Sequence, residues 1–470
     1  MSGIFGIVSD RNCVDDLFYG TDYQFHLGTK IGGMAVYDRK DIHYKIKSIG
    51  LYPFRPQLFN FKENVKARSG IGVVSDYEVQ PFKIKSHLGN YALAHVGKIA
   101  NLEKLALREL EKGKNFIENT EEEFNQVELI ANLISQGKSF VEGIEIMQNE
   151  IKGSSSLMLL TKEGIYLARD KSGRTPIVVG RKLGSMAATS ETTAFENLGF
   201  EFEKDLGPGE IGLLTNEVYR QLKEPRNKLQ LCTFLPIYYG FPTSCYEGVN
   251  AEQIRYQFGE FLAQRDLDEG GFDVDFVFGI PDSGVGSGIG YSNKSGLPYE
   301  RGFVKYTPTW GRSFMPQDQK IRDLVAEYKL IGNRRIIKNK KIIITEDSIV
   351  RGTQLKEKVR ELFKHGATEV HARISCPPLT HACNFLNFSR SKSIMDLATR
   401  RAMKKVEGRD VFDITSYTDE NSEKYGRMVE VIRMDLGLTS LKFQYFNDMV
   451  EAVGLPAENL CPGCWREVEA

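Results

Sequence analysis

The sequence has no excess of charge of either sign, since 62 Lys and Arg residues balance 62 Asp and Glu residues. A nucleic-acid-binding protein normally carries a basic excess, so we expect no nucleic-acid partner. No apolar run reaches the roughly 20 residues that span a bilayer, and residues 1–8 have neither a basic start nor a cleavable apolar core. We therefore expect a cytoplasmic protein that is neither secreted nor attached to a membrane.

Cysteine is also scarce, and seven residues scattered over 470 do not resemble a disulfide framework. Low-complexity segments and internal repeats are missing as well. The remaining composition, 41% hydrophobic and 26% charged, is that of an ordinary globular protein. A chain of this length is too long for one compact domain, so we predict two large domains and take a soluble enzyme as the starting hypothesis.

The first half of the chain alternates short apolar runs with turn residues, and two of its segments have apolar residues at helical spacing. This pattern predicts stacked antiparallel sheets with helices. A charged stretch with a proline, residues 221–228, is expected to connect the halves, so we place the domains at 1–225 and 226–470. Strands are expected at 1–9, 30–36, 70–74, 155–161, 164–169, 176–180 and 207–214, and helices at 102–112 and 121–136.

The second half changes to strands that alternate with helices, which favours a parallel sheet. Two of the expected strands lead directly into short polar loops, Pro281-Asp-Ser-Gly284 and Glu346-Asp-Ser-Ile-Val-Arg-Gly-Thr353. Strands are expected at 276–280, 341–345 and 369–375, and an amphipathic helix at 354–365, ended by Gly366.

The strongest local signal is the loop at 346–353. Two adjacent acids, Glu346 and Asp347, end a β-branched strand, and a loop rich in Gly and hydroxyl groups leads into a helix. Ligands of open α/β sheets bind at the carboxyl ends of strands, and loop amides with a helix N-terminus favour a phosphate. The acids suit ribose hydroxyls and hydrated Mg²⁺, and Arg351 can contact a phosphate. Two acids alone are equally consistent with a solvated turn, but the whole string favours a phosphate site.

This string resembles the phosphoribosyl pyrophosphate loop of type I phosphoribosyltransferases, and the chain is similar to one family among them. That family is glutamine amidophosphoribosyltransferase, the first committed enzyme of purine synthesis, whose loop has Asp where Glu346 stands here. The resemblance implies an N-terminal αββα sandwich of the N-terminal-nucleophile type and a C-terminal type I phosphoribosyltransferase domain with a parallel sheet. It rests further on Pro281–Gly284, Gly288, Gly290-Tyr291, residues 295–299, Gly302, Lys305, residues 311–314, Gln317 and Arg322.

The resemblance implies that ammonia displaces pyrophosphate from Mg²⁺-bound phosphoribosyl pyrophosphate to give 5-phosphoribosylamine. Glu346 adds a methylene to the family's Asp and keeps its charge, so binding is expected to be retuned rather than lost. By similarity, Asp282, Ser283 and Gly284 would hold the pyrophosphate, and Glu346 and Asp347 the ribose diol. Ser283, Glu346 and Asp347 would take part in binding Mg²⁺. Lys305 and Arg312 would shield the site from a flexible flap. Ser348, Ile349, Val350, Arg351, Gly352 and Thr353 would cradle the 5′-phosphate.

The resemblance also interprets four of the cysteines. One branch of the family binds a [4Fe-4S] cluster through four cysteines, and Cys232, Cys383, Cys461 and Cys464 lie at the corresponding positions. A Zn²⁺ ion would accept the same four thiolates, and four unligated cysteines are the remaining alternative. The other three, Cys13, Cys245 and Cys376, match no family position and are expected to be free buried thiols.

The amide-hydrolysing half is expected to be disabled. The motifs at 3–7, 168–170, 173–176, 190–191 and 207–211 fit the family, but the catalytic positions do not.

Ser2 stands where the family has its nucleophilic Cys. A serine hydroxyl needs a base to become a nucleophile, and the α-amino group of Ser2 would serve as that base after removal of Met1. The family's carboxylate-binding Arg corresponds to Ser75, at the end of the segment 70–75, so that contact is missing. Val96 replaces the Asn that stabilises the oxyanion, and the loss of such a donor commonly costs ~10²–10³ in rate. The acidic contact to the glutamine amino group falls near 119–123. We predict a structural or regulatory remnant.

Three functions follow as hypotheses. The first is a transferase that uses ammonia, free or supplied by a partner protein. The second is a paralogue that uses another small amine, and the third is a regulatory subunit that binds phosphoribosyl pyrophosphate without turnover. The resemblance also implies a homo-oligomer.

Overall fold

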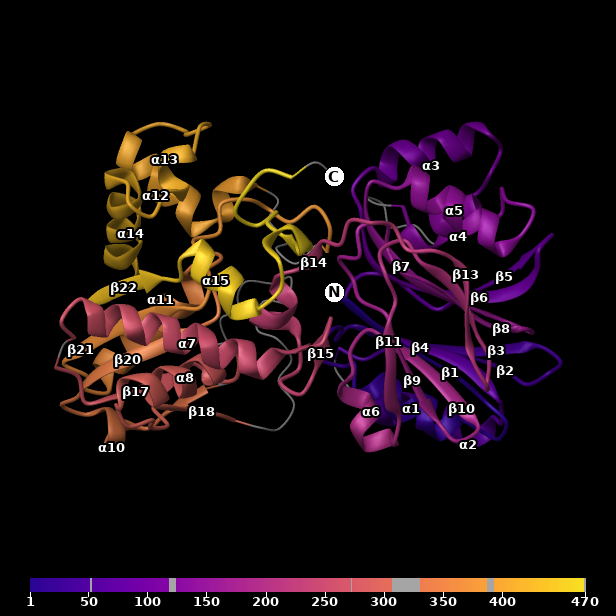
Figure 1. The fold of residues 1–470 in the computed structure, drawn as a ribbon, viewed down its shortest axis with the longest axis horizontal. Helices are drawn as coiled ribbons and strands as arrows, with labels where there is room; N and C mark the ends of the chain where they lie inside the picture. Colours follow the sequence, from indigo (N-terminus) through magenta and orange to yellow (C-terminus); the bar gives the residue numbers. More distant parts are fainter. Residues whose placement is uncertain (51–52, 118–123, 272, 307–329, 387–392, 469–470) are drawn as a thin grey trace.

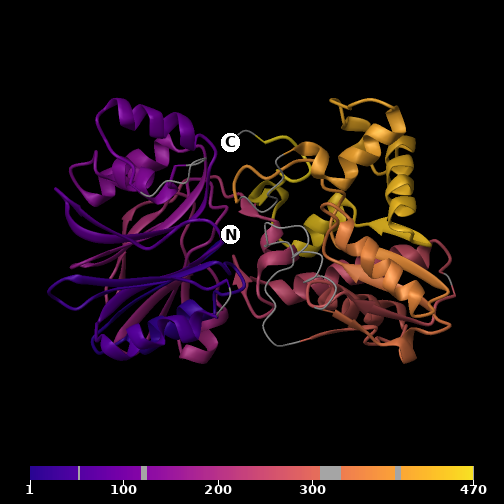
Figure 2. The same ribbon diagram turned by 180° about the vertical axis from the view of Figure 1, so that it is seen from behind.

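The computed structural model describes residues 1–50, 53–117, 124–271, 273–306, 330–386 and 393–468. Two bodies lie side by side along the long axis of the molecule, one built from the first half of the chain and the other from the second (Figure 1). Seen from behind, both ends of the chain lie at the junction between them (Figure 2).

The first body is a sandwich of two antiparallel sheets. The seven-stranded sheet has the order β11-β9-β10-β1-β4-β2-β3, and the six-stranded sheet has the order β13-β12-β8-β7-β6-β5. The strands are β1 Ser2–Ser9, β2 Ile31–Tyr37, β3 Ile42–Ser48, β4 Ser69–Ser75, β5 Phe82–Ser86, β6 Gly89–Ile99, β7 Gly153–Thr161, β8 Gly164–Ala168, β9 Val178–Lys182, β10 Ser185–Thr189, β11 Glu201–Asp205, β12 Ile211–Leu214 and β13 Tyr219–Lys223.

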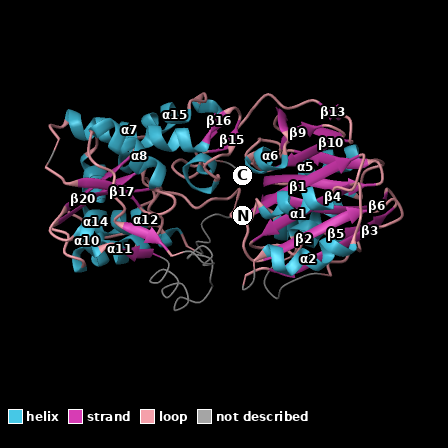
Figure 3. Ribbon diagram, turned by 90° about the horizontal axis from the view of Figure 1, so that it is seen from below, coloured by secondary structure: helices cyan, strands magenta, loops and turns pink. Residues whose placement is uncertain are grey.

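Apolar side chains fill both the space between the sheets and their outer faces. On β4, Ile71 and Val73 face the other sheet, whereas Val74 packs with the helices outside. Two helices on the face of the seven-stranded sheet are visible in Figure 3. Helices α1 Val14–Asp22, α2 Phe54–Asn64 and α6 Thr193–Leu198 cover that sheet, and α3 Leu102–Glu111, α4 Gln126–Ile134 and α5 Phe140–Glu150 cover the other. The αββα sandwich expected from the resemblance is confirmed.

The second body is built on a four-stranded parallel sheet of order β17-β20-β21-β22. Val277 and Ile343 pack with Leu262 and Tyr291 on one face, and Ile344 packs with the larger core on the other. The strands are β17 Phe276–Gly279, β20 Lys341–Glu346, β21 Glu369–Ile374 and β22 Ser440–Phe443, and the main helices are α7 Ala251–Asp268, α8 Val285–Ser295, α11 Thr353–Lys364, α12 Ala398–Glu407 and α14 Glu423–Leu436. The predicted parallel sheet is confirmed.

Smaller elements complete this body. They include β14 Leu231–Cys232 paired with β23 Leu460–Cys461, β15 Cys245–Tyr246 with β16 Val249–Asn250, and β18 Phe303–Lys305 with β19 Leu330–Gly332. The short helices are Leu235–Tyr239, α10 Arg334–Ile337, Ile394–Asp396, α13 Thr415–Thr418, α15 Phe446–Val453 and Ala457–Asn459. Within the described ranges, every helix is too short or too polar to cross a membrane.

The expected connector at 221–228 is partly strand, because β13 continues to Lys223 before the chain passes to β14. The domain boundary at 225/226 stays a prediction. The two bodies contact each other through hydrogen bonds: the Lys98 N–H donates to the Phe385 carbonyl (2.9 Å) and the Cys232 N–H to the Arg174 carbonyl (3.2 Å).

Candidate active site

The two polar loops predicted from separate motifs meet at one edge of the parallel sheet. Strands β17 and β20 are parallel neighbours with Gly279 opposite Thr345, so the loops that follow them start side by side. Thr345 Oγ1 donates to the Gly284 carbonyl at 2.8 Å. A side chain at Gly284 would place its Cβ 2.1 Å from the Thr345 carbonyl oxygen, so the close approach of the loops requires glycine there.

A hydrogen bond between side chains links the two loops. Ser283 Oγ donates to Glu346 Oε1 at 2.7 Å, and the Asp347 N–H donates to the same oxygen at 3.1 Å. Burial, and next the negative charge of Asp347, raise the pKa of Glu346 well above its usual range. Asp347 is buried and accepts a hydrogen bond from Ser348 Oγ at 2.6 Å. A group that donates hydrogen bonds or carries positive charge would therefore be stabilised beside this acid pair.

A cavity of about 310 Å³ opens next to the 281–284 loop. Lys305, from β18, lines it and forms an ion pair with Asp282 at 2.5 Å. Both side chains retain solvent exposure, so a ligand can compete for either. Arg312, residues 311–314, Gln317 and Arg322 lie outside the described residues.

The rest of the 346–353 loop leads into α11, as expected. Ile349 is buried in the core, and the Val350 carbonyl accepts a hydrogen bond from the Ala398 N–H at 2.8 Å. Gly352 has φ +78°, a left-handed conformation that favours glycine, and α11 begins at Thr353. Backbone N–H groups at the start of a helix favour an anion, so the geometry fits the predicted phosphate cradle. Arg351 lies beside Asp396 at 3.7 Å.

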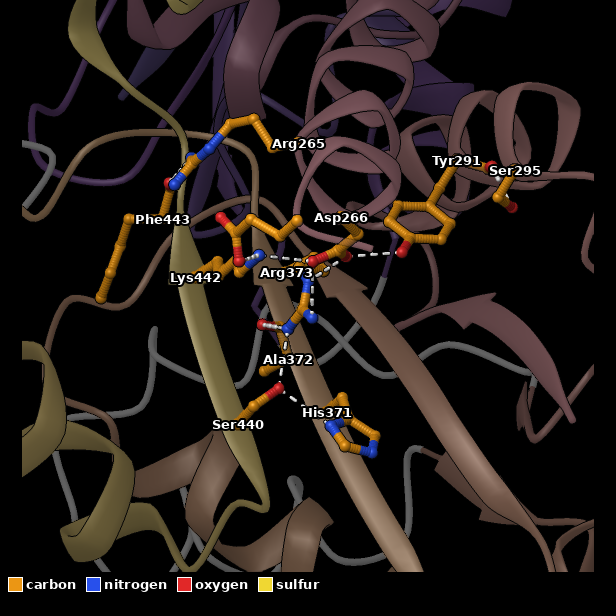
Figure 4. Close-up of polar contacts among 11 residues, drawn as sticks. Arg265, Asp266, Tyr291, Ser295, His371, Ala372, Arg373, Ser440, Lys442 and Phe443 are labelled. Atoms are coloured by element: carbon orange, nitrogen blue, oxygen red, sulfur yellow. Dashed lines mark hydrogen bonds and ion pairs between the residues drawn. The ribbon is translucent and has the colours of Figure 1, made fainter. Parts of the chain in front are cut away.

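A buried ionic network that the sequence did not reveal supports this sheet (Figure 4). Arg373, on β21, is fully buried and donates two hydrogen bonds to Asp266 of α7, at 2.6 and 3.0 Å. Tyr291 donates to Asp266 at 2.5 Å, and Lys442 pairs with it at 2.7 Å. Tyr291 belongs to α8, which follows the 281–284 loop directly, so Asp266 holds that helix against the sheet. An Arg in the middle of the strand expected at 369–375 was the available signal.

The four cysteines expected to act as ligands meet at the junction of the two bodies. Cys232 lies opposite Cys461 where β14 pairs with β23, and Cys383 and Cys464 line the same small cavity. The N–H groups of Phe385 and Leu386 donate to Cys383 Sγ at 3.4 and 3.3 Å. Burial raises the pKa of Cys383 and, more strongly, of Cys232 and Cys464.

These thiols do not form a closed set around one ion. Across the described part of the chain, no three His, Cys, Asp or Glu side chains converge as ligands of a single metal ion. Tetrahedral Zn²⁺ with Zn–S bonds of ~2.3 Å would need the sulfurs within about 4 Å of one another. Each thiolate of a [4Fe-4S] cluster binds its own iron, whereas one zinc ion would bind all four, and both groups stay predictions for this site. Of the other cysteines, Cys13 and Cys376 are buried free thiols as expected, whereas Cys245 is half-buried.

The corresponding glutaminase positions are occupied by hydrogen-bonded or apolar side chains. Ser2 Oγ donates to Ser75 Oγ at 3.0 Å, and both residues are buried. Ser75 Oγ also accepts the N–H groups of Tyr77 and Glu78, at 3.2 and 3.1 Å, which shapes the turn after β4. Val96 packs in the apolar core between the two sheets. Residues 119–123 are not among those described.

The fold and these sites define a two-part enzyme class, in which an amidotransferase-type sandwich is joined to a type I phosphoribosyltransferase sheet. A family model described as a glutamine amidotransferase domain matches residues 66–197. The amidophosphoribosyltransferase of Methanocaldococcus jannaschii is 30% identical over 99% of this chain and 96% of its own length, and that of Synechococcus elongatus 31% over 99% and 90%.

The solved structure of glutamine phosphoribosylpyrophosphate amidotransferase from Bacillus subtilis, complexed with ADP and GMP, superposes with a TM-score of 0.81 at 26% identity and covers 99% of this chain and 97% of that one. The chain belongs to the amidophosphoribosyltransferase family, whose members are pentosyltransferase enzymes.

Proposed function

We propose that this protein transfers the phosphoribosyl group of 5-phosphoribosyl 1-pyrophosphate to ammonia, releasing pyrophosphate and forming 5-phosphoribosylamine. The observation that carries the proposal is the convergence of the 281–284 and 346–353 loops, joined by the hydrogen bond from Ser283 to Glu346. The 281–284 loop is suited to the leaving pyrophosphate and the 346–353 loop to the ribose 5-phosphate. The anomeric carbon would therefore lie between the two loops, at the edge of the sheet where they meet.

The chain's own groups would position the substrate. Breaking the anomeric bond leaves positive charge on the sugar and negative charge on pyrophosphate, so stabilising the leaving charge and excluding water matter most. Lys305 pairs with Asp282 in the structure, and a pyrophosphate in the neighbouring cavity would compete for its ammonium group. Arg312 stays a predicted second cation of the flap.

The oxygen donors at this edge fit Mg²⁺. Ser283, Glu346 and Asp347 offer a hydroxyl and two carboxylates, and Mg²⁺ commonly binds through one or two carboxylates together with substrate phosphates. When bound, the ion would neutralise charge on the pyrophosphate. Asp347 is the member of the set that Ser283 does not engage, so we assign it the main share of metal and ribose-diol binding.

We assign the nitrogen source to ammonia rather than glutamine. The Ser2 hydroxyl donates a hydrogen bond to Ser75. Ser75 stands where the family has the Arg that binds the glutamine carboxylate, and its hydroxyl is already hydrogen-bonded to the Tyr77 N–H of the following turn. Val96 offers a methyl-bearing side chain inside an apolar core where an amide would be needed. With nucleophile, clamp and oxyanion donor all changed, free ammonia or ammonia from a partner protein is the consistent donor.

A [4Fe-4S] cluster on Cys232, Cys383, Cys461 and Cys464 is part of the proposal. Support comes from the cavity that the four cysteines share and from the N–H donors to Cys383 Sγ. Iron and acid-labile sulfide in anaerobically purified protein would support it, whereas stoichiometric zinc would reject it.

The test of the proposed activity is formation of pyrophosphate and 5-phosphoribosylamine from phosphoribosyl pyrophosphate and Mg²⁺, with either ammonium or glutamine as nitrogen source. We expect turnover with ammonium and none above background with glutamine. Glutamine turnover equal to that with ammonium would reject the ammonia assignment. A product mass showing another amine would reject ammonia as the acceptor.

A further inference from the structure

The cavity that holds the four cysteines is completed by a side chain from the other body. Arg174 follows β8 in the amidotransferase-type sandwich, yet it lines the same cavity as Cys232, Cys383, Cys461 and Cys464. Its backbone is fixed there, because the Cys232 N–H donates to the Arg174 carbonyl at 3.2 Å and the Gln230 N–H to the Ser172 carbonyl at 2.7 Å.

The guanidinium of Arg174 is buried but not fully satisfied. The residue is 4% exposed, Nη2 donates to Gln230 Oε1 at 2.7 Å, and the group lies 3.7 Å from the ring centroid of Phe385. The Nε–H is buried and has no hydrogen-bond partner. Among the described residues, no carboxylate forms an ion pair with Arg174. A buried charged donor without an acceptor is costly, so the position points to an acceptor of negative charge in the cavity.

The chemistry of the cavity identifies that acceptor. Besides Arg174, its walls are the four thiols, two aromatic rings, Gly463 and Thr233, whose hydroxyl donates to the Cys461 carbonyl. A [4Fe-4S] cluster ligated by four thiolates carries net negative charge on sulfur atoms. Hydrogen bonds to those sulfurs and nearby charge set the cluster's reduction potential and its resistance to oxygen.

We propose that Arg174 is a positioning residue of the cluster site: its Nε–H donates to a cluster or cysteine sulfur, and its charge favours the reduced cluster. This inference rests on the cluster assigned above. It gives the sandwich a role that does not depend on glutamine hydrolysis, because a residue of that body encloses a cofactor held by the other.

A second contact supports the same role. The segment 95–98, where the family has its oxyanion residues, bonds through the Lys98 N–H to the Phe385 carbonyl. Phe385 is both the ring under Arg174 and one of the N–H donors to Cys383 Sγ. The degenerate segment and Arg174 therefore hold the same cysteine loop from two sides.

The test compares full-length wild-type protein, Arg174→Met and Arg174→Lys, all purified anaerobically. Arg226→Met is the matched control, because the Arg226 side chain is exposed and donates to the exposed Asn149, while its backbone N–H bonds to the Pro208 carbonyl and is kept in the variant. The readouts are iron and sulfide content, midpoint potential in a dithionite titration, and the rate at which air bleaches the cluster absorption.

We expect Arg174→Met to have a more negative midpoint potential and to bleach several-fold faster, Arg174→Lys to recover the potential in part, and Arg226→Met to match the wild type. An Arg174→Met protein with wild-type potential and bleaching rate would overturn the proposal. If Arg174→Met does not fold, a wild-type result for Arg174→Lys in both readouts would overturn it. Wild-type protein without iron would overturn the cluster assignment itself. Because iron is measured in the wild type first, this failure is distinguished from a failure of the Arg174 proposal.

Discussion

At the scale of single residues, the acid pair at 346–347 separates two tasks. Glu346 is held by Ser283 and by the Asp347 N–H, so its longer side chain folds back onto the loops and links them. Asp347 is buried, and its carboxylate accepts a hydrogen bond from the neighbouring Ser348 hydroxyl rather than from Ser283. The two carboxylates are therefore expected to respond differently to substitution.

Asp347→Asn should lower kcat/KM for phosphoribosyl pyrophosphate with ammonium by about 10²-fold or more, because a charge that stabilises metal and sugar is lost. Glu346→Asp restores the residue of the family loop and should retain activity within about tenfold, since charge is kept and only the reach to Ser283 is shortened. Steady-state kinetics at saturating Mg²⁺ measures both.

Asp410→Asn, a change in an exposed ion pair with Lys404, is the control and should leave the kinetics unchanged. Equal losses in Glu346→Asp and Asp347→Asn would contradict the division of tasks.

The sequence revealed these residues because the signal is local. Each loop follows a short apolar strand and is read within a dozen residues, so 281–284 and 346–353 are recognisable without the fold. Asp266 and Arg373 are separated by 107 positions, and only the packing of α7 against β21 brings them together. The link between Ser283 and Glu346 likewise depends on the order of β17 and β20 in the sheet.

At the scale of elements, the polar network around Asp266 fixes the helices behind the site. Asp266→Asn should lower the free energy of unfolding by about 3–5 kcal/mol, because it removes the negative charge that accepts two hydrogen bonds from the fully buried Arg373. Tyr291→Phe removes one hydrogen bond to the same carboxylate and should cost only about 1 kcal/mol. Urea unfolding followed by circular dichroism measures both variants.

A loss in Asp266→Asn no larger than in Tyr291→Phe would show that the ionic network does not stabilise this body. The charge-conserving Arg373→Lys separates charge from geometry: it should fall between the two, because an ammonium cannot reproduce the paired hydrogen bonds of a guanidinium.

Long apolar runs were recognised as strands, whereas the exposed β3 and the buried but small-residue β10 were both missed. Every residue of β7 is buried, and its apolar run at 155–161 was evident. Strand β3 is exposed at most positions, so few of its side chains carry an apolar signal, and it was not predicted. The helix expected at 121–136 begins at Gln126 in the structure, where Asn125 accepts hydrogen bonds from the first turn.

At the scale of the whole molecule, a second buried charge cluster joins the two bodies. Arg169 is fully buried and pairs with Glu247 at 2.6 Å, and Asp205 lies close to both. Burial, and next the negative charge of Glu247, raise the pKa of Asp205 to about 7, against the opposing effects of Arg169 and Lys204. The folded protein therefore binds this proton more tightly than the unfolded chain does.

The sign of the pH dependence follows from that shift. Stability from the protonated Asp205 is fully present below its ordinary pKa of 3.8 and is lost as the pH rises through about 7. Asp205→Asn should therefore raise the free energy of unfolding by about 1–3 kcal/mol at alkaline pH and by progressively less toward pH ~5. Thermal unfolding across this range measures the trend.

The exposed Asp410→Asn variant should show no such trend. A gain for Asp205→Asn that is equal at both ends of the pH range would mean that Asp205 does not titrate between them.

Calorimetry tests most directly whether the two converging loops bind an activated sugar phosphate. Phosphoribosyl pyrophosphate is titrated into wild-type protein and into Asp347→Asn, with Mg²⁺ present and no nitrogen source. We expect saturable heat with one site per chain for the wild type and much weaker or undetectable binding for the variant. No binding to the wild type, or unchanged binding to the variant, would contradict this expectation.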